Sequence, residues 1–228
     1  RLKQLVAARR NVCWILFAAP EPVQRWFSSA GVPALVLGSC VPDLSLPSVD
    51  LNYAAVGWHA AGSIISHGHR NIGLILPAQP LPGDVACREE FLHYVTQRMA
   101  GITVTECSLT GNPVQFRVKL SRLLTGPRRP TALLSMRPTF TVALLMHVLG
   151  AGLHVPRDVA IISRDSHPFL ESALPDLTRY SSTSMKLATR AVRIAASLLA
   201  GRHVPTKPIL VMPTYVTGST LGKRDHSL

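Results

Sequence analysis

Residues 130–166, PTALLSMRPTFTVALLMHVLGAGLHVPRDVAIISRDS, decide the fold class. Two short apolar runs, Ala132–Ser135 and Val159–Ile162, flank the segment Thr139–Ala151, which has the length and apolar stripe of a helix. Neither run alternates apolar and polar residues, which is typical of strands buried on both faces. Gly152 indicates the end of the helix. The order strand, helix, strand therefore predicts a parallel βαβ unit.

The same alternation extends along most of the chain. Further strands are predicted at Val12–Phe17, Ala34–Leu37, Ile72–Leu76, Ile102–Glu106 and Ile209–Val216. Further helices are predicted at Glu21–Ala30, Tyr53–His67, Val85–Ala100, Val114–Leu124 and Ser184–Ala200. Single short runs are ambiguous, but their repeated order predicts an α/β fold in which helices flank parallel sheets.

The composition is that of a folded domain with a basic surface. Of the 228 residues, 47% are hydrophobic, and 24 Lys and Arg against 12 Asp and Glu give a formal net charge of +12. This apolar fraction excludes a disordered tail. The four cysteines lie far apart without a CxxC pair, which favours reduced thiols in a cytoplasmic protein over a disulfide framework or a structural zinc site. The longest apolar stretch, Phe140–Leu153, is too short to cross a bilayer, and no signal-peptide pattern opens the chain.

Motifs typical of enzymes are missing from the sequence. We find no GxGxxG, P-loop, GxSxG or HExxH, and no constellation of paired carboxylates. With few acidic residues, general acid–base chemistry has few candidates. We therefore expect no catalytic residues, no cofactor and no metal site.

Three stretches together resemble the effector-binding domain of the LacI/GalR family of bacterial transcription regulators. The first is VDLNYAAVGWHAAGSIISHGHRNIGLIL, residues 49–76, with its Gly68–His69–Arg70 pattern followed by a strand. The second is residues 130–166, with an AGL-VP-DV element and a strand ending near Asp165. The third is LTRYSSTSMKLATRAV, residues 177–192, followed later by Gly218–Ser219–Thr220. Their order and spacing cover nearly the whole chain.

The resemblance implies two Rossmann-like lobes of the periplasmic binding protein-like type I fold, joined by three crossovers with a small molecule between them. Carried onto this sequence, residues 1–50 and 182–205 form the N-terminal lobe, residues 51–180 and 207–222 form the C-terminal lobe, and residues 223–228 are a tail. The family domain normally begins with a strand, a helix and another strand before the position of Arg1. We therefore expect the first lobe to be incomplete and less stable than a full domain.

Candidate effector-binding residues follow the predicted strands, because ligands bind beyond the carboxyl ends of parallel strands. This topology alone nominates Arg88, Arg137 and Asp165. The resemblance matches Asp165 to the acidic residue that ends the family's V-G-F-D element and accepts hydrogen bonds from sugar hydroxyls. A carboxylate can accept from two adjacent hydroxyls, which suits a diol. The alternative is a loop or helix-capping aspartate.

Arg88 matches the arginine of the family's R-x-x-G-F element, which touches effector, although Phe91 replaces the glycine. The alternative for Arg88 is a surface residue at the start of a helix, paired with Asp84 or Glu89. In the first lobe, some members of the family have an acidic effector-binding residue at the position of Gly38. Ser39 is the polar residue nearest to that position. Ser182 lies at a crossover between the two lobes, at a position where members of the family frequently have a glutamine that faces the effector.

Arg137 and Arg164 depart from the family pattern. Arg137 replaces an asparagine that often contacts effector, and Arg164 replaces an aromatic or aliphatic residue before Asp165. With Arg88, these arginines would outnumber Asp165, which suggests a sugar or metabolite that carries negative charge. A neutral sugar is the preferred interpretation, because arginine also hydrogen-bonds neutral polyols.

These features predict the effector-binding and dimerisation domain of a cytoplasmic LacI-type repressor. Its expected partners are a small molecule, most simply a sugar, a second copy of the chain, and operator DNA contacted through an upstream helix-turn-helix domain absent from this sequence. The alternative is a periplasmic solute-binding protein of a sugar transporter, which shares the architecture. An enzyme on a Rossmann-like scaffold is a third possibility, against which the missing motifs argue.

Overall fold

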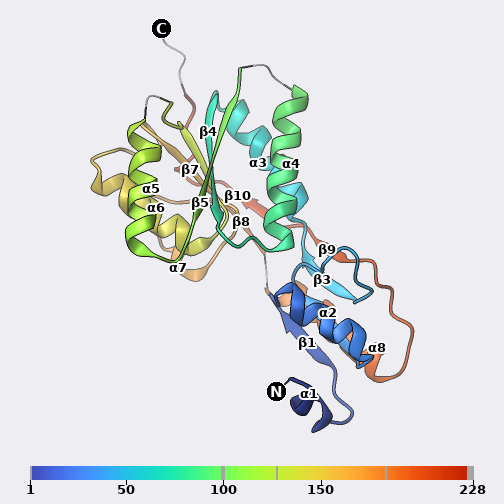
Figure 1. The fold of residues 1–228 in the computed structure, drawn as a ribbon. Helices are drawn as coiled ribbons and strands as arrows, with labels where there is room; N and C mark the ends of the chain where they lie inside the picture. Colours follow the sequence, from blue (N-terminus) through green and yellow to red (C-terminus); the bar gives the residue numbers. More distant parts are fainter. Residues whose placement is uncertain (1, 99–100, 127, 183, 225–228) are drawn as a thin grey trace. The chain divides into compact units, whose positions relative to one another are not determined.

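The computed structural model describes residues 2–98, 101–126, 128–182 and 184–224. The chain divides into two compact units (Figure 1). Unit 1 contains Arg1–Asn52 and Thr183–Met212, and unit 2 contains Tyr53–Ser182 and Pro213–Leu228. The predicted α/β class with parallel sheets flanked by helices is confirmed.

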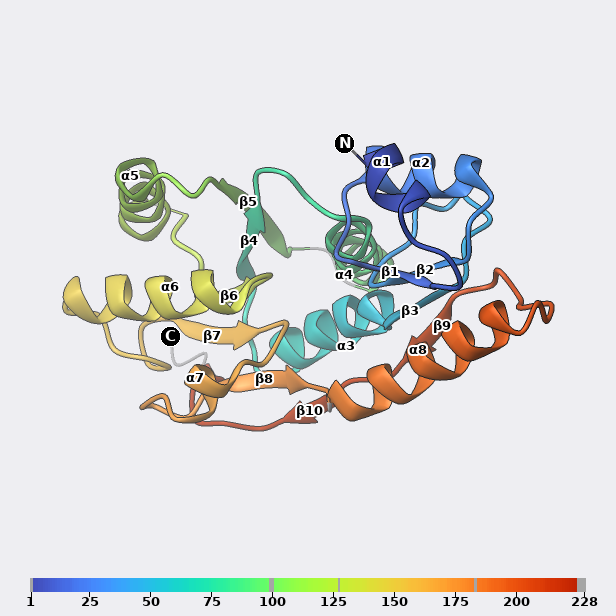
Figure 2. The ribbon, with the colours of Figure 1, turned by 90° about the horizontal axis from the view of Figure 1, so that it is seen from below.

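Unit 1 is a four-stranded parallel sheet in the order β1-β2-β3-β9. Its strands are β1 Trp14–Phe17, β2 Ala34–Leu37, β3 Ser48–Leu51 and β9 Ile209–Val211, and its helices are α1 Leu2–Ala7, α2 Glu21–Ala30 and α8 Ser184–Leu199. Apolar side chains of α1 and α2 pack with β1 and β2 in one cluster, whereas α8 packs on Leu35 and Val49 in another. Helices α2 and α8 thus cover opposite faces of this sheet (Figure 2).

Unit 2 is a six-stranded sheet in the order β10-β8-β7-β6-β4-β5, in which only the β10–β8 pairing is antiparallel among the described strands. Its strands are β4 Asn71–Pro77, β5 Thr103–Leu109, β6 Ala132–Ser135, β7 Ala160–Ser163, β8 Thr178–Ser181 and β10 Thr214–Val216. Its helices are α3 Tyr53–Ser66, α4 Pro82–Arg98, α5 Pro113–Thr125, α6 Pro138–Gly150 and α7 Pro168–Glu171.

Each face of the unit 2 sheet carries its own apolar core. Leu74 and Leu76 of β4 face α3 and α4, whereas Ile75 between them faces α5 and α6. Successive strand residues point to opposite faces, so a continuous apolar run is what a sheet covered on both sides requires. The two helix pairs lie on the two sides of the sheet in Figure 1.

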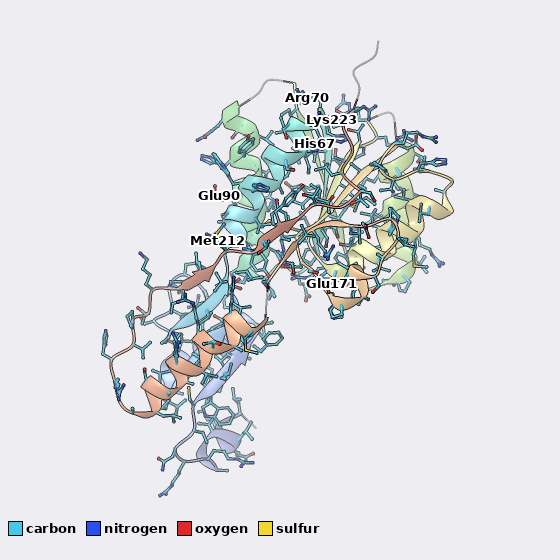
Figure 3. The ribbon with its side chains drawn as sticks, turned by 180° about the vertical axis from the view of Figure 1, so that it is seen from behind. His67, Arg70, Glu90, Glu171, Met212 and Lys223 are labelled. Carbon is cyan, nitrogen blue, oxygen red and sulfur yellow. The ribbon has the colours of Figure 1, made fainter. Side chains whose placement is uncertain are left out.

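The carboxyl ends of the parallel strands define one end of unit 2. Glu171, on the short helix after β7, lies at this end, and Arg70, which precedes β4, lies at the opposite end beside Lys223 (Figure 3). Segments that follow β4, β6 and β7 therefore converge at the same edge of the sheet.

Several predicted elements are confirmed to the residue, namely the strands 34–37 and 132–135 and the helix 21–30. Strands β3 and β8 were not predicted, because their sequences SVDL and TRYS contain polar residues and lack an apolar run.

The predicted strand Ile209–Val216 was wrong as a single element. It is two strands, since β9 pairs with β3 in unit 1 and β10 pairs with β8 in unit 2. Pro213 lies between them and cannot donate a backbone hydrogen bond to a continuous ladder. The assignment of residues 207–222 to the C-terminal lobe is corrected accordingly, because the chain leaves unit 1 after Met212.

Candidate functional site

A buried carboxylate begins the assembly of the site. Asp84 lies in the first turn of α4, after β4, and is 1% exposed. Its Oδ2 accepts a hydrogen bond from the backbone N–H of Leu81 at 2.8 Å, which satisfies one of the unpaired donors at a helix start. A buried carboxylate needs cationic partners as well.

Two arginines from neighbouring loops supply these partners. Arg137 follows β6 and donates from Nη1 to Asp84 Oδ1 at 2.8 Å and from Nη2 to Oδ2 at 2.5 Å. Arg164 follows β7 and donates from Nη1 to Asp84 Oδ1 at 2.5 Å. The parallel register of β6 and β7 brings them together, and the Arg164 amide donates to the Ser135 carbonyl at 2.8 Å.

Arg164 links Asp84 to a second carboxylate. Its Nε and Nη2 donate to Asp165 Oδ2 at 3.1 and 2.7 Å. The guanidinium carbon lies 4.0 Å from the centre of the Tyr53 ring, and the Arg164 side chain is 1% exposed. Arg137, Asp84, Arg164 and Asp165 thus form one chain of alternating charge, here named the charged cluster.

The charged cluster contains two cations and two anions. Burial alone would lower the pKa of Arg164, but the negative charges of Asp165 and Asp84 outweigh it and hold that pKa above its ordinary value. Burial also raises the pKa of the nearby Cys87 thiol to about 12, so this thiol is neutral at physiological pH. Since the formal charges sum to zero, the cluster is not a cationic site.

Asp165 is one of the two partly exposed ends of the charged cluster, and Arg137 is the other. The Asp165 side chain is 16% exposed, and Arg164 occupies Oδ2 from the buried side. Within the described residues, no donor reaches its Oδ1. This oxygen can therefore accept hydrogen bonds from hydroxyl groups of a ligand, while Arg164 holds the carboxylate in place.

Three of the residues nominated from the sequence, Arg137, Arg164 and Asp165, lie together in the charged cluster. Arg88 lies elsewhere: it donates from Nε and Nη2 to Glu106 of β5 at 2.8 and 2.7 Å, with its side chain 39% exposed. Its partner is therefore neither Asp84 nor Glu89.

The rotation of α4 about its axis explains the position of Arg88. Phe91 and Cys87, one turn apart, are both fully buried, whereas Arg88 is the next residue around the helix from Cys87. An effector contact of Arg88 stays an untested prediction.

The two nominated serines lie in different units. Ser39 of unit 1 donates a short hydrogen bond to Asp50, and Ser182 is half-buried after β8 in unit 2. Their roles stay predictions.

Sequence reasoning named Asp84 only as a possible partner of Arg88 and did not nominate Asp84 or Tyr53 as residues of the site. Asp84 had a usable signal, since it follows Pro82–Gly83 at the start of the helix after β4, a position that lies at the ligand-binding edge by topology. Tyr53 opens α3 and carried no comparable signal.

Two further features are absent from the part of the chain that the structure describes. Within it, no group of three or more His, Cys, Asp or Glu side chains could hold a metal ion. The same residues include no helix with the length and apolar character needed to span a bilayer.

Comparisons with known protein families and curated proteins give consistent matches. The family model for a periplasmic binding protein-like domain matches residues 61–221. The HTH-type transcriptional repressor CytR of Escherichia coli is 24% identical over 176 residues, which are 75% of this chain and 51% of that protein. The HTH-type transcriptional regulator CelR of Thermobifida fusca is 23% identical over 202 residues, 86% of this chain and 58% of that protein. The chain thus spans about half the length of the curated relatives it matches.

Solved structures share the fold at low sequence identity. A LacI family transcriptional regulator from Bifidobacterium animalis subsp. lactis matches with a TM-score of 0.85 and 19% identity, covering 98% of this chain and 83% of that chain. One from Mycobacterium smegmatis matches with a TM-score of 0.82 and 22% identity, covering 97% and 83%. One from Enterococcus faecium with bound ribose has a TM-score of 0.78 and 15% identity, covering 92% and 80%.

Proposed function

The chain belongs to the periplasmic binding protein-like domain family, and from this we propose that it is the effector-binding domain of a LacI-type transcription regulator. The observation that carries the proposal is the charged cluster, which presents the Asp165 carboxylate at the carboxyl ends of β4, β6 and β7. Ligands of open parallel sheets bind at this edge. The names of the relatives support a regulator and do not favour a transporter receptor.

In this proposal Asp165 accepts hydrogen bonds from adjacent hydroxyls of a sugar or related metabolite. Arg137 contributes from the same edge, and Ser182, Ser39 and Arg88 are further candidates for ligand contacts. An effector that binds one arrangement of the protein more tightly than another shifts the population toward that arrangement. Such a shift would alter DNA binding by a separate domain of the full-length regulator. In this proposal the protein is cytoplasmic and performs no catalytic step.

We also propose that the domain forms a homodimer. Helices α5 and α6 expose Val114, Val118, Met146 and Leu149, with exposed fractions between 43% and 68%, and Leu174 is 84% exposed. Helices α5 and α6 contact each other, and exposed apolar side chains on adjoining helices favour a protein interface.

Isothermal titration calorimetry of the chain with D-ribose, D-glucose and related neutral sugars tests effector binding. We expect Asp165→Asn to weaken binding of a sugar ligand at least about tenfold, since charged hydrogen bonds are lost. The matched control is Asp43→Asn, which removes a carboxylate from the exposed Arg25 pair in unit 1. Sugar binding that is unchanged by Asp165→Asn would contradict the assigned site.

Sedimentation velocity across a wide range of protein concentrations tests the dimer. Val118→Glu on α5 should shift the equilibrium toward monomer, because it places a charge in the proposed interface. Val192→Glu on α8 is the control, since Val192 is also exposed but lies in unit 1. A monomer at all concentrations, or equal effects of both variants, would refute this part of the proposal.

A further inference from the structure

The charged cluster carries an inference about ligand class, which rests on the proposed function. We propose that Arg164 determines specificity by committing its guanidinium to Asp84 and Asp165, so that the site binds an uncharged polyhydroxyl ligand and excludes the phosphate ester of that ligand. A ligand anion that took the place of either carboxylate partner of Arg164 would leave Asp84 with fewer partners or Asp165 without its guanidinium.

The commitment of Arg164 is visible in its contacts. All three of its nitrogen atoms donate to carboxylates, Nη1 to Asp84 and Nε with Nη2 to Asp165. The side chain is 1% exposed and lies over the Tyr53 ring. Turning it toward a ligand would leave Asp84, which is equally buried, with fewer partners. Loss of a partner from a buried ion pair is strongly unfavourable.

Arg137 is committed in the same way. Both of its terminal nitrogens donate to Asp84, although its side chain is 26% exposed. Asp84 therefore acts as an internal anion that occupies both arginines. The sequence-based hypothesis of a negatively charged effector counted Arg88, Arg137 and Arg164 against Asp165 alone. It did not include Asp84, and Arg88 pairs with Glu106.

The Asp165 carboxylate and the Arg137 guanidinium are the two partly exposed groups of the cluster, and both terminal nitrogens of Arg137 are already bound to Asp84. A hydroxyl can donate to Asp165 Oδ1, whereas a phosphate beside it would meet a like charge with both neighbouring cations already neutralised. Repulsion between charges a few ångströms apart at a protein surface amounts to several kcal/mol, which corresponds to a factor of at least about one hundred in affinity.

The first test compares each neutral sugar with its own phosphate ester by calorimetry. The pairs are D-ribose with D-ribose 5-phosphate and D-glucose with D-glucose 6-phosphate. We expect the neutral member of a binding pair to bind at least about one hundredfold more tightly. Equal or tighter binding of the phosphate ester would overturn the inference while leaving the proposed function intact.

The second test needs no knowledge of the natural ligand. Inorganic phosphate is titrated into the wild-type chain and into Asp165→Ala, which removes the anion and opens space beside Arg164. The variant should bind phosphate at least about tenfold more tightly than the wild type, because a guanidinium is released for a charge-assisted hydrogen bond. Asp165→Asn, which removes the charge but keeps the shape of the side chain, is titrated with phosphate in the same way. Asp43→Ala is the control, since it removes one carboxylate partner from the exposed Arg25, which keeps its pair with Glu21.

The two tests separate the possible failures. If no sugar binds but Asp165→Ala gains phosphate binding over Asp43→Ala, the proposed function fails for these sugars. The inference that Arg164 is committed to Asp84 and Asp165 is then retained. If the wild type binds phosphate as tightly as Asp165→Ala does, the inference is wrong.

A third measurement distinguishes a specificity role of Arg164 from a structural one. Arg164→Lys keeps the charge, but one ammonium cannot reproduce the fork that joins both carboxylates. We expect the ratio of D-ribose to D-ribose 5-phosphate affinities to fall at least about tenfold in this variant. A purely structural role would lower stability and leave the ratio unchanged. If Arg164→Lys does not fold, the phosphate titration of Asp165→Ala decides.

Discussion

Arg164 Nη1 lies 2.5 Å from Asp84 Oδ1, although the two residues are 80 positions apart in the chain. Both side chains are 1% exposed, so this ion pair is shielded from solvent on both sides. The pair joins the loop after β7 to the start of α4 and holds Asp165 through the same guanidinium. It therefore couples the stability of unit 2 to the geometry of its candidate ligand site.

Replacing Arg164 should lower the free energy of unfolding far more than replacing Arg88. Arg164→Met leaves Asp84 and Asp165 with fewer partners, and we expect the free energy of unfolding to fall by about 3–5 kcal/mol. Arg88→Met breaks an equally well-formed but exposed pair with Glu106, and we expect a loss below about 1 kcal/mol. Urea unfolding followed by circular dichroism measures both. Similar losses for the two variants would mean that burial does not set the strength of these pairs.

The Tyr53 ring should contribute to holding Arg164. The guanidinium lies 4.0 Å from the ring centre, and a desolvated contact of this kind contributes about 2 kcal/mol. We expect Tyr53→Leu to reduce the free energy of unfolding by about that amount more than Tyr53→Phe, because phenylalanine retains the aromatic face. Chemical denaturation of both variants gives the difference, which would be near zero if the ring served only as apolar packing.

Gly57 sets the approach of α3 to α4. A Cβ at this position would lie 2.0 Å from the Cys87 carbonyl oxygen, so Gly57→Ala must push the two helices apart. We expect a net loss of about 1–3 kcal/mol despite the better helix propensity of alanine. Gly150→Ala in α6 is the control, because a Cβ there meets no atom within 4 Å, and it should be neutral or stabilising. Thermal unfolding of the two variants tests this contrast.

His69 should make unit 2 less stable as the pH falls. The ring is 3% exposed; its Nε2 donates to the Gly222 carbonyl at 3.1 Å, and its Nδ1 shares a 3.0 Å hydrogen bond with Thr131 Oγ1. Burial lowers its pKa below the ordinary value of 6.5. The unfolded chain then binds more protons below pH 6.5, so stability is complete above that pH and declines as the pH falls toward the lower folded-state pKa.

The decline attributable to His69 can reach about 1.4 kcal/mol per pH unit. Unfolding free energies of the wild type and of His69→Asn, measured between neutral pH and pH 5, provide the test. We expect a lower but flatter curve for the variant. Parallel curves would show that His69 does not titrate with unfolding.

Local patterns sufficed for much of the fold. The apolar runs of β2, β4 and β6 and the helix between β6 and β7 were readable because strands covered on both faces contain few polar residues. The polar strands β3 and β8 were not predicted, since each also pairs with a strand that is distant in sequence, β9 and β10 respectively. The division of the run 209–216 between two sheets likewise depends on its pairing partners.

For the site, the sequence by itself determined that Asp165, Arg164 and Arg137 follow parallel strands, because the carboxyl end of each strand can be located from its own residues. Only the tertiary structure decided which charges pair. The rotation of α4 turns Cys87 inward and directs Arg88 to Glu106, and the alignment of the α4 start with the segments after β6 and β7 places Asp84 between Arg137 and Arg164. Ion pairing depends on distances of a few ångströms between residues many positions apart, and a local pattern contains no such distances.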